Sequence, residues 1–566
     1  MKGSGSIGKM VMILIMVPTI VAILILTGCG SKQDDVPIPA ESVIYLRLEN
    51  MNANWDQLKQ RETIAKCMQW QLWKEPFMQD LLKPVNEMKQ DFRDNTGLPL
   101  NETTIMSMLG RRVDIAVVPT DRLPAVILVT NLGHKSTPMK QMSKALESLD
   151  GDRTTRSEYL NHDIIAVRTQ PQDADDSDVP EHILYTFHRD DLIVSTDREL
   201  LQSSIALLEN DSETLMDQPE FTAMMDAVNC SGFIAFVRPG AIADTVGSIN
   251  GSPDSSGNLH SEWIGMGAEL TPTGIRMASV MKPSGLPENV FDSLYPDDKA
   301  IHQAARWLSS QSIMGIACGV DTAALVDHER EILGSVQIPD GGSVWSMLTN
   351  TLQNTTGMDI PAELAAWGGD GVFFGMNTIR MALFVPVPDC SLGITVSDPA
   401  AARDFMNRVV TRIIEAYEPA IQTTAEVILP GNHSYRYFPV AMIEDLQPGY
   451  VLIDNMLIIG TSASSVTENI MAFTGDRVRL LDAPAFSTII DPGQDGIMAC
   501  KAIDPTQLAQ AGRRIVDSLS LLIVAADHKP SVYYEILDTI AMITACGGHI
   551  RHDDRLILSD GVIEFI

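Results

Sequence analysis

The chain alternates between short apolar runs and longer segments with helical periodicity. Runs of five or six largely apolar residues predict strands, and segments whose apolar side chains recur every three or four positions predict amphipathic helices. The predicted strands are Val113–Val118, Ala125–Val129, Val372–Met376 and Leu392–Val396, and the predicted helices are Glu75–Asp94, Pro138–Leu149, Ser343–Thr355 and Pro399–Tyr417. Strand runs separated by single helices predict an α+β fold, with an antiparallel or mixed sheet and helices packed on one face.

Polar bends between apolar runs predict β-hairpins. Ile183–Thr196 bends at Arg189–Asp191, and Val451–Ser462 bends at Asp454-Asn455. The Ser/Thr residues after each of these hairpins are expected to cap a following helix, Arg198–Leu208 or Ser465–Phe473. Two further hairpins are expected at Met266–Met281 and His549–Ile566.

Several segments recur in the same order about 265 residues further along the chain. The matched pairs are Leu215–Phe221 with Leu480–Phe486, Ile183–Thr196 with Val451–Ser462, Gly232–Ala235 with Gly496–Ala499, and Thr96–Leu98 with Thr356–Met358. Self-similarity at a nearly constant offset is typical of internal repeats. We therefore expect two tandem homologous units, 41–290 and 300–566, after an export segment (1–28) and a short tether (29–40).

The N-terminus has the pattern of an export signal. Lys2 and Lys9 precede an unbroken apolar stretch, Met10–Leu26, which ends at Leu26-Thr27-Gly28-Cys29. This tetrapeptide resembles the lipobox of bacterial lipoproteins. The resemblance implies that Leu26, Thr27 and Gly28 form the cleavage motif, and that the Cys29 thiol receives a diacylglycerol and anchors the chain to a membrane.

The length of the apolar stretch leaves an alternative, an uncleaved signal anchor in the inner membrane. Both interpretations place the body of the chain away from the cytoplasm, because Lys2 and Lys9 favour an N-terminus that stays inside. In a diderm bacterium, Gly30 in place of aspartate favours the outer membrane. The body also resembles bacterial envelope lipoproteins of unassigned function, on the basis of Pro39-Ala40-Glu41-Ser42 before the predicted strand Val43–Leu48.

The excess of acidic side chains limits which classes of partner the chain can bind. The 566 residues include 73 acidic and 41 basic side chains, for a formal net charge of -32. Nucleic acid requires a basic surface, so we expect no nucleic-acid partner. The membrane is the expected partner through Cys29, and an envelope protein or an apolar ligand are further candidates.

Residue types that carry chemistry are scattered. The body contains six cysteines without any CxxC spacing: Cys67, Cys230, Cys318, Cys390, Cys500 and Cys546. Cys500 with Cys546 is the first disulfide pair to test. His549 and His552 are the closest histidine pair, but positions three apart on a strand face opposite sides, which disfavours joint metal ligation. We expect no metal and no cofactor. Trp70 and Trp73 are expected to pack in a core.

These observations favour a non-catalytic cell-envelope lipoprotein with a binding or structural role. Two alternatives remain open. The 29 methionines are compatible with a carrier of an apolar ligand such as lipid, since flexible thioethers line adaptable pockets. A hydrolase whose residues meet only in space is the other alternative, because triad members need not be close in sequence.

Overall fold

The computed structural model describes two compact units. The first comprises residues up to Ile64 and Leu72–Lys282, and the second comprises Ala65–Gln71 and Pro283–Ile566. The described residues are 36–566 except 97–98, 100, 103–110, 121–123, 134–153, 169–180, 211, 244–260, 285–289, 296–297, 328–349, 351–352, 355, 383–384, 418–422, 441–445, 485, 488–495, 527, 554 and 566. The leader and Cys29 lie outside them.

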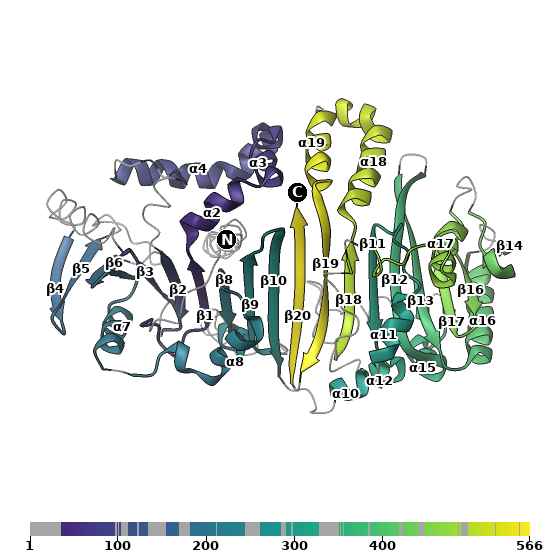
Figure 1. Cartoon of the computed structure of the whole chain (residues 1–566), viewed down its shortest axis with the longest axis horizontal. Coiled ribbons are helices and arrows are strands. Elements are labelled where there is room, and N and C mark those ends of the chain that lie inside the picture. The colour runs from purple at the N-terminus through teal and green to yellow at the C-terminus, as the bar shows by residue number, and fades with distance from the viewer. Residues whose placement is uncertain are drawn as a thin grey trace. The chain divides into compact units, whose positions relative to one another are not determined.

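The described residues of the first unit contain ten antiparallel strands (Figure 1). Their order across the sheet is β4-β5-β6-β7-β3-β2-β1-β8-β9-β10. The strands are β1 (Ile44–Glu49), β2 (Arg112–Val118), β3 (Ala125–Asn131), β4 (Thr154–Tyr159), β5 (His162–Arg168), β6 (His182–His188), β7 (Asp191–Ser195), β8 (Phe233–Val237), β9 (Ser261–Leu270) and β10 (Gly274–Pro283). The helices of this unit are α2 (Met51–Lys59), α4 (Pro76–Thr96), α7 (Arg198–Asn210), η3 (Leu215–Asp217) and α8 (Pro219–Val228), and two short helices, α3 (Glu62–Met68) and η1 (Gln71–Lys74), each contain residues of both units.

Ten described strands also form the sheet of the second unit. Their order is β14-β15-β16-β17-β13-β12-β11-β18-β19-β20. They are β11 (Met314–Gly319), β12 (Gly368–Ala382), β13 (Val385–Val396), β14 (Ala425–Leu429), β15 (His433–Tyr437), β16 (Gly449–Ile453), β17 (Met456–Gly460), β18 (Ile497–Ile503), β19 (Ile543–Asp553) and β20 (Leu556–Phe565). The helices are α10 (Val290–Leu294), α11 (Asp298–Ala305), α12 (Thr322–Asp327), α15 (Ile360–Trp367), α16 (Pro399–Tyr417), η4 (Pro430–Asn432), α17 (Ala463–Thr474), α18 (Pro505–Ala525) and α19 (Pro530–Ile540).

The α+β class predicted from the sequence is confirmed, and the sheet is antiparallel. The predicted helix Pro399–Tyr417 is α16, and the predicted hairpins at Met266–Met281 and His549–Ile566 are β9–β10 and β19–β20. The strands predicted at Val372–Met376 and Leu392–Val396 extend into one long hairpin, β12–β13. The helix predicted at Pro138–Leu149 lies outside the described residues, and most of the helix predicted at Ser343–Thr355 does too.

The expectation that helices pack on one face is wrong for the second unit. On β17, Met456 and Ile458 belong to a core that includes α11 and α17, whereas Leu457 belongs to a core formed with α15 and α16. Successive side chains of a strand point to opposite faces of the sheet. The two pairs of helices therefore cover opposite faces, because the strands at this end are apolar on both sides.

The prediction that a Ser or Thr after each hairpin caps the following helix is confirmed for α17 and is wrong for α7. Ser462 caps α17, and its hydroxyl oxygen accepts a hydrogen bond from the Ser465 amide. In the first unit, the amide of Leu200 donates to Asp197 instead, so the carboxylate after the hairpin takes the role expected of Ser or Thr.

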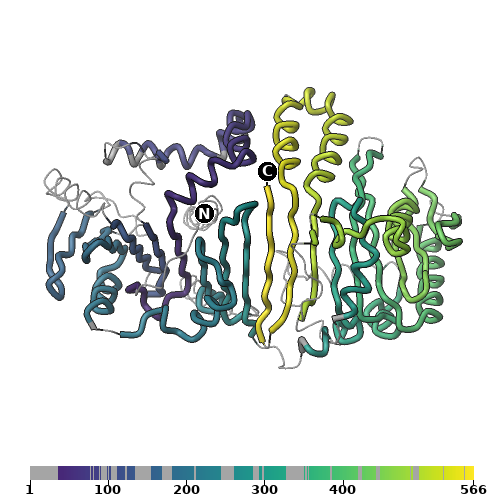
Figure 2. The backbone as a smooth tube through the Cα atoms, in the orientation of Figure 1, coloured from purple at the N-terminus to yellow at the C-terminus, as the bar shows by residue number. Residues whose placement is uncertain are grey.

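Helices α18 and α19 form a hairpin that connects β18 to β19 and projects beyond the ends of these strands (Figure 2). The two helices pack on each other. Their contact is close at Gly512, where an added Cβ would lie 2.4 Å from Cδ2 of Leu537. None of the described helices combines the length and the apolar composition that a membrane-spanning helix requires.

Candidate functional site

Three potential metal ligands meet at one end of the sheet in the first unit. His162 begins β5, His188 ends β6, and Glu209 lies in the last turn of α7. The pairing of β5 with β6 aligns Ile165 with Tyr185, and this register continued to the strand ends places His162 opposite His188. Helix α7 packs on β3, β6 and β7 (Figure 1). Its last turn places Glu209 near both histidines.

Local backbone geometry positions His162. Leu160 and Asn161 form a two-residue turn between β4 and β5, and both have a positive φ, 48° and 63°. This is the conformation that tight hairpin turns require, and asparagine tolerates it well. The turn therefore fixes the position of His162 at the start of β5.

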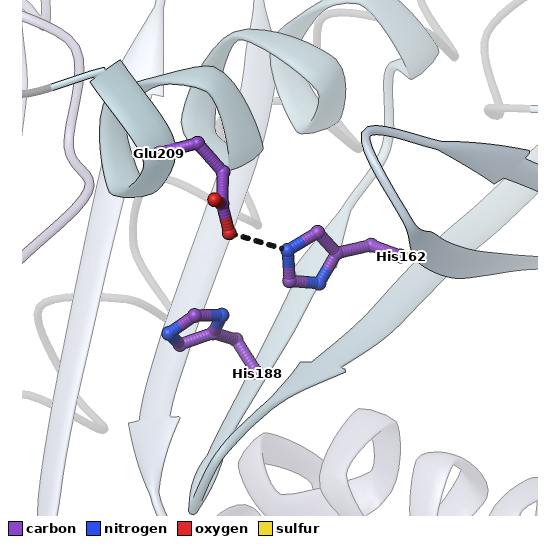
Figure 3. Close-up of side chains that lie close together, drawn as sticks. All are labelled: His162, His188 and Glu209. Carbon is purple, nitrogen blue, oxygen red and sulfur yellow. Dashed lines mark hydrogen bonds and ion pairs between the residues drawn. The ribbon is translucent and has the colours of Figure 1, made fainter.

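The three side chains face one another (Figure 3). The Nε2 atom of His162 lies 2.9 Å from Oε1 of Glu209, and the ring centroids of His162 and His188 are 5.2 Å apart. One ligand atom from each of the three residues lies within 4.8 Å of the others. Among the described residues, this is the group of three or more His, Cys, Asp or Glu side chains with such spacing.

The electrostatics favour a neutral His188 and an ionised Glu209 at neutral pH. The pKa of His188 is lowered by burial and then by the charges of His162 and Arg189. The pKa of Glu209 is lowered, mainly by its hydrogen bond with His162. A neutral imidazole has a lone pair available for a metal ion, and a carboxylate adds negative charge.

A second polar cluster, buried between β1 and β2, is closed to solvent. Asp114 is 0% exposed; its Oδ1 accepts hydrogen bonds from the Tyr45 hydroxyl at 2.6 Å and from Nε of Arg47 at 2.8 Å. Nε of Arg112 lies 2.8 Å from its Oδ2, and Glu49 lies 3.8 Å from Arg47. Burial and then the charge of Asp114 raise the pKa of Tyr45 well above its usual range. The cluster holds two strands together and offers no access to a substrate.

The six cysteines of the body are thiols rather than disulfides. The sheet register explains why Cys500 and Cys546 do not pair. Cys500 lies opposite His549, and Cys546 lies opposite Ile503, three residues further along β18, so the two thiols point to opposite faces. Burial raises the pKa of Cys500 to about 12 and also raises the pKa of Cys67, Cys318, Cys390 and Cys546. A raised pKa disfavours the nucleophilic thiolate.

Other residues singled out from the sequence are dispersed. His549 is buried on β19, and His552 is half-buried and stacks on Tyr295 with a centroid distance of 6.3 Å. Trp70 is half-buried, and its indole N–H donates to the Thr539 hydroxyl at 2.8 Å. Trp73 is also half-buried, so neither tryptophan has the fully buried position expected from the sequence.

His162, His188 and Glu209 are 26 and 21 residues apart in the chain, so their spacing in the sequence did not indicate a cluster. One signal was available. The predicted bend at Arg189–Asp191 places His188 at a hairpin end, and an asparagine directly before His162 is typical of another tight turn. Only the register between the two hairpins brings the imidazoles together.

Comparison with known proteins identifies no family. No family model and no curated protein matches the chain. Three solved crystal forms of TP0453, a membrane-associated protein of Treponema, are similar to part of it. Crystal form III has 9% sequence identity and a TM-score of 0.24, and the alignment covers 45% of this chain and 82% of that one. Crystal form I has 8% identity and a TM-score of 0.25, with 45% and 81% coverage.

Proposed function

We propose that this chain is a cell-envelope lipoprotein, anchored through Cys29 and facing away from the cytoplasm, with a non-catalytic binding or structural role. The proposed location and lipid anchor depend on the lipobox-like Leu26-Thr27-Gly28-Cys29 after a basic and apolar leader. Mass spectrometry of the N-terminal peptide tests it. We expect a chain that begins at a lipid-modified Cys29, and a peptide that retains residues 1–28 with an unmodified thiol contradicts it.

The non-catalytic part of the proposal is supported by how the described polar groups are used. The carboxylate of Asp114 is occupied by Tyr45 and two arginines inside the sheet. The buried thiols have raised pKa values, opposite to the shift that activates a catalytic cysteine. Turnover of an ester, peptide or glycoside substrate by the purified protein, lost on a single substitution, would favour the hydrolase alternative.

The binding role depends on one observation, the apolar end of α18. Leu521, Leu522 and Val524 lie near the tip of the projecting hairpin, and Leu521 is 84% exposed. Contiguous exposed apolar side chains mark interaction sites more often than single, scattered apolar side chains do. We propose this tip as the contact surface for an envelope partner.

A photo-crosslinking amino acid at position 521 of the full-length protein, expressed in cells, tests this contact. Position 428 is the control, because Ile428 is a similarly exposed apolar residue on β14. Adducts to a particular envelope protein at 521 but not at 428 support the proposal. Adducts to lipid alone favour the alternative of an apolar-ligand carrier, and equal yields at both positions contradict a specific contact.

We further propose that the two units arose by tandem duplication. Their ten described strands follow the same order when each strand number of the first unit is raised by ten. Equivalent hydrogen bonds accompany this order. Thr196 N–H donates to the Val126 carbonyl while Val126 N–H donates to the Thr196 hydroxyl, and Thr461 and Cys390 make the same reciprocal pair 265 and 264 residues later.

The same correspondence holds where each unit enters its first strand. Pro39 forms a bridge with Thr214, and Ser309 forms the equivalent bridge with Arg479. An experimental structure in which β1–β10 and β11–β20 superpose strand for strand supports the duplication, and a different strand order in either unit overturns it.

A further inference from the structure

We propose that His162, His188 and Glu209 form a binding site for a divalent transition-metal ion, for which Zn²⁺ is the best-fitting representative. Two imidazole nitrogens and one carboxylate oxygen are a ligand set that zinc accepts, whereas Mg²⁺ and Ca²⁺ prefer oxygen ligands throughout. The site goes beyond the proposed envelope role and does not depend on it.

The geometry requires only small side-chain movements. Zinc bonds of roughly 2.0–2.2 Å in a tetrahedral arrangement place neighbouring ligand atoms about 3.3 Å apart. The ligand atoms here already lie within 4.8 Å of one another, and the closest pair is 2.9 Å apart. His162 and His188 occupy opposed strand positions, so their Cβ atoms are held close by the sheet. The Glu209 side chain is 43% exposed, which leaves it room to move toward a bound ion.

The charges around the cluster also favour a cation. Glu209 lies in the last turn of α7, where the helix dipole presents its negative end. Glu209 and Asp191 are the carboxylates that act on His188, and Arg189 and His162 oppose them. A bound dication would satisfy the helix end and the carboxylate together, and Glu209 would exchange its hydrogen bond with His162 for a metal bond.

The corresponding positions of the second unit serve as an internal comparison. His433 follows the β14–β15 turn as His162 follows the β4–β5 turn, so this histidine has a counterpart. The residue that ends β16 is Ile453, in the place of His188, and Thr474 near the end of α17 takes the place of Glu209. The proposed site is therefore a property of the first unit alone.

In the first unit, a bound ion would connect α7 to both hairpins at this end of the sheet. Three protein ligands leave a fourth position for water or for a ligand atom from outside the protein. The exposed side of Glu209 gives solvent access to that position.

Zinc titration of the detergent-solubilised full-length protein against a chromogenic chelator tests the site. We expect one tightly bound ion per chain. His188→Ala and Glu209→Gln should each weaken zinc binding by about tenfold to a hundredfold or more. Loss of a residue that only supports a metal ligand already has an effect of about tenfold to a hundredfold. His433→Ala is the matched control and should leave the affinity unchanged. An unchanged affinity in the His162→Ala/His188→Ala double variant, or the absence of binding by the wild type, overturns the proposal.

Cobalt substitution separates this site from adventitious binding at cysteines. Co²⁺ held by nitrogen and oxygen ligands in a four-coordinate site gives visible d–d bands without the near-ultraviolet charge-transfer band of a thiolate ligand. The d–d bands should disappear in His188→Ala. A thiolate band that persists in His188→Ala assigns the ion to cysteine and contradicts the site. His162→Gln keeps the polarity and approximate size of the residue and should lose the bands with an unchanged circular dichroism spectrum.

Discussion

The strand pair β1–β2 and its topological counterpart β11–β12 occupy equivalent positions in their sheets, but different kinds of residue line one face of each pair. Each pair has six aligned positions, and the second, fourth and sixth point to one face. In β1–β2 these positions hold Tyr45–Ala116, Arg47–Asp114 and Glu49–Arg112. In β11–β12 they hold Gly315–Gly375, Ala317–Phe373 and Gly319–Gly371.

The small residues of β11–β12 admit a helix. A Cβ added at Gly319 would lie 3.0 Å from the amide nitrogen of Ile301, and one at Gly371 would lie 3.0 Å from the carbonyl oxygen of Ala300. The backbone of α11 therefore lies directly on these strands, and Phe373 stacks on Trp307 beside it. Dispersion and apolar burial stabilise this pair, whereas β1–β2 depends on ion pairs between buried charges.

Among the substitutions considered, Asp114→Ala is expected to lower the free energy of unfolding most. This change leaves Arg47 and Arg112 buried without their shared carboxylate, and removal of one partner from a buried ionic cluster costs about 3–5 kcal/mol. Urea denaturation with hydrogen exchange of peptides from β1 and β2 measures the loss within the first unit. Unchanged exchange in β1 would show that the charges are not essential to this strand pair.

A double-mutant cycle with Arg47→Met and Asp114→Asn sharpens this result. The two residues are in direct contact, so we expect a coupling free energy in the range of about 0.5–3 kcal/mol. Additive effects would mean that each charge is stabilised by its other neighbours.

In the second unit, Gly393→Ala tests the dependence on small residues. Gly393 on β13 lies opposite Phe373, and its added Cβ would lie 1.9 Å from Cε1 of that ring. The ring must move out of a fully buried position, which we expect to cost about 1–3 kcal/mol. Gly240→Ala is the control, because nothing lies within 4 Å of the added methyl group there. Equal denaturation midpoints for the two variants would contradict the prediction.

A surface ion pair should matter much less than the buried cluster. Arg408 on α16 donates to both carboxylate oxygens of Glu363 on α15, each at 2.7 Å, but its side chain is 45% exposed. Glu363→Gln is expected to cost about 0.2–1 kcal/mol because solvent screens exposed pairs. Denaturation at low and high salt checks this, since the screened difference should shrink as salt increases. A loss as large as that of Asp114→Ala would contradict the role assigned to burial.

The smallest predicted effect is a change in the pH dependence of stability. The pKa of His188 is lowered from 6.5 in the folded state, so the unfolded chain takes up a proton first as pH falls. The contribution is fully present above pH 6.5 and is lost as pH falls through the folded pKa. His188→Asn should flatten this part of the curve in metal-free protein, measured by urea denaturation at a series of pH values. His528→Asn, at an exposed position, should leave the slope unchanged.

Much of the local structure could be predicted because it depends on neighbouring residues. The polar bend at Arg189–Asp191 and the proline that begins α16, Pro399, specify a turn and a helix start within a few positions. Apolar runs likewise identified the central strands. Strand β12 begins before the predicted Val372, at Gly368, because Gly368, Gly369 and Gly371 lack the apolar side chains that mark a strand, and here they allow close packing within it.

By itself, the sequence determined the α+β class, several central strands and hairpins, and a recurrence near 265 residues, because periodicity, turn chemistry and repeated motifs act over short stretches of chain. Only the tertiary structure decided which faces the helices cover, that Cys500 and Cys546 point apart, and that His162, His188 and Glu209 converge. Those outcomes depend on strand register. A shift of one residue turns every side chain to the other face, and the packing of distant segments selects the register.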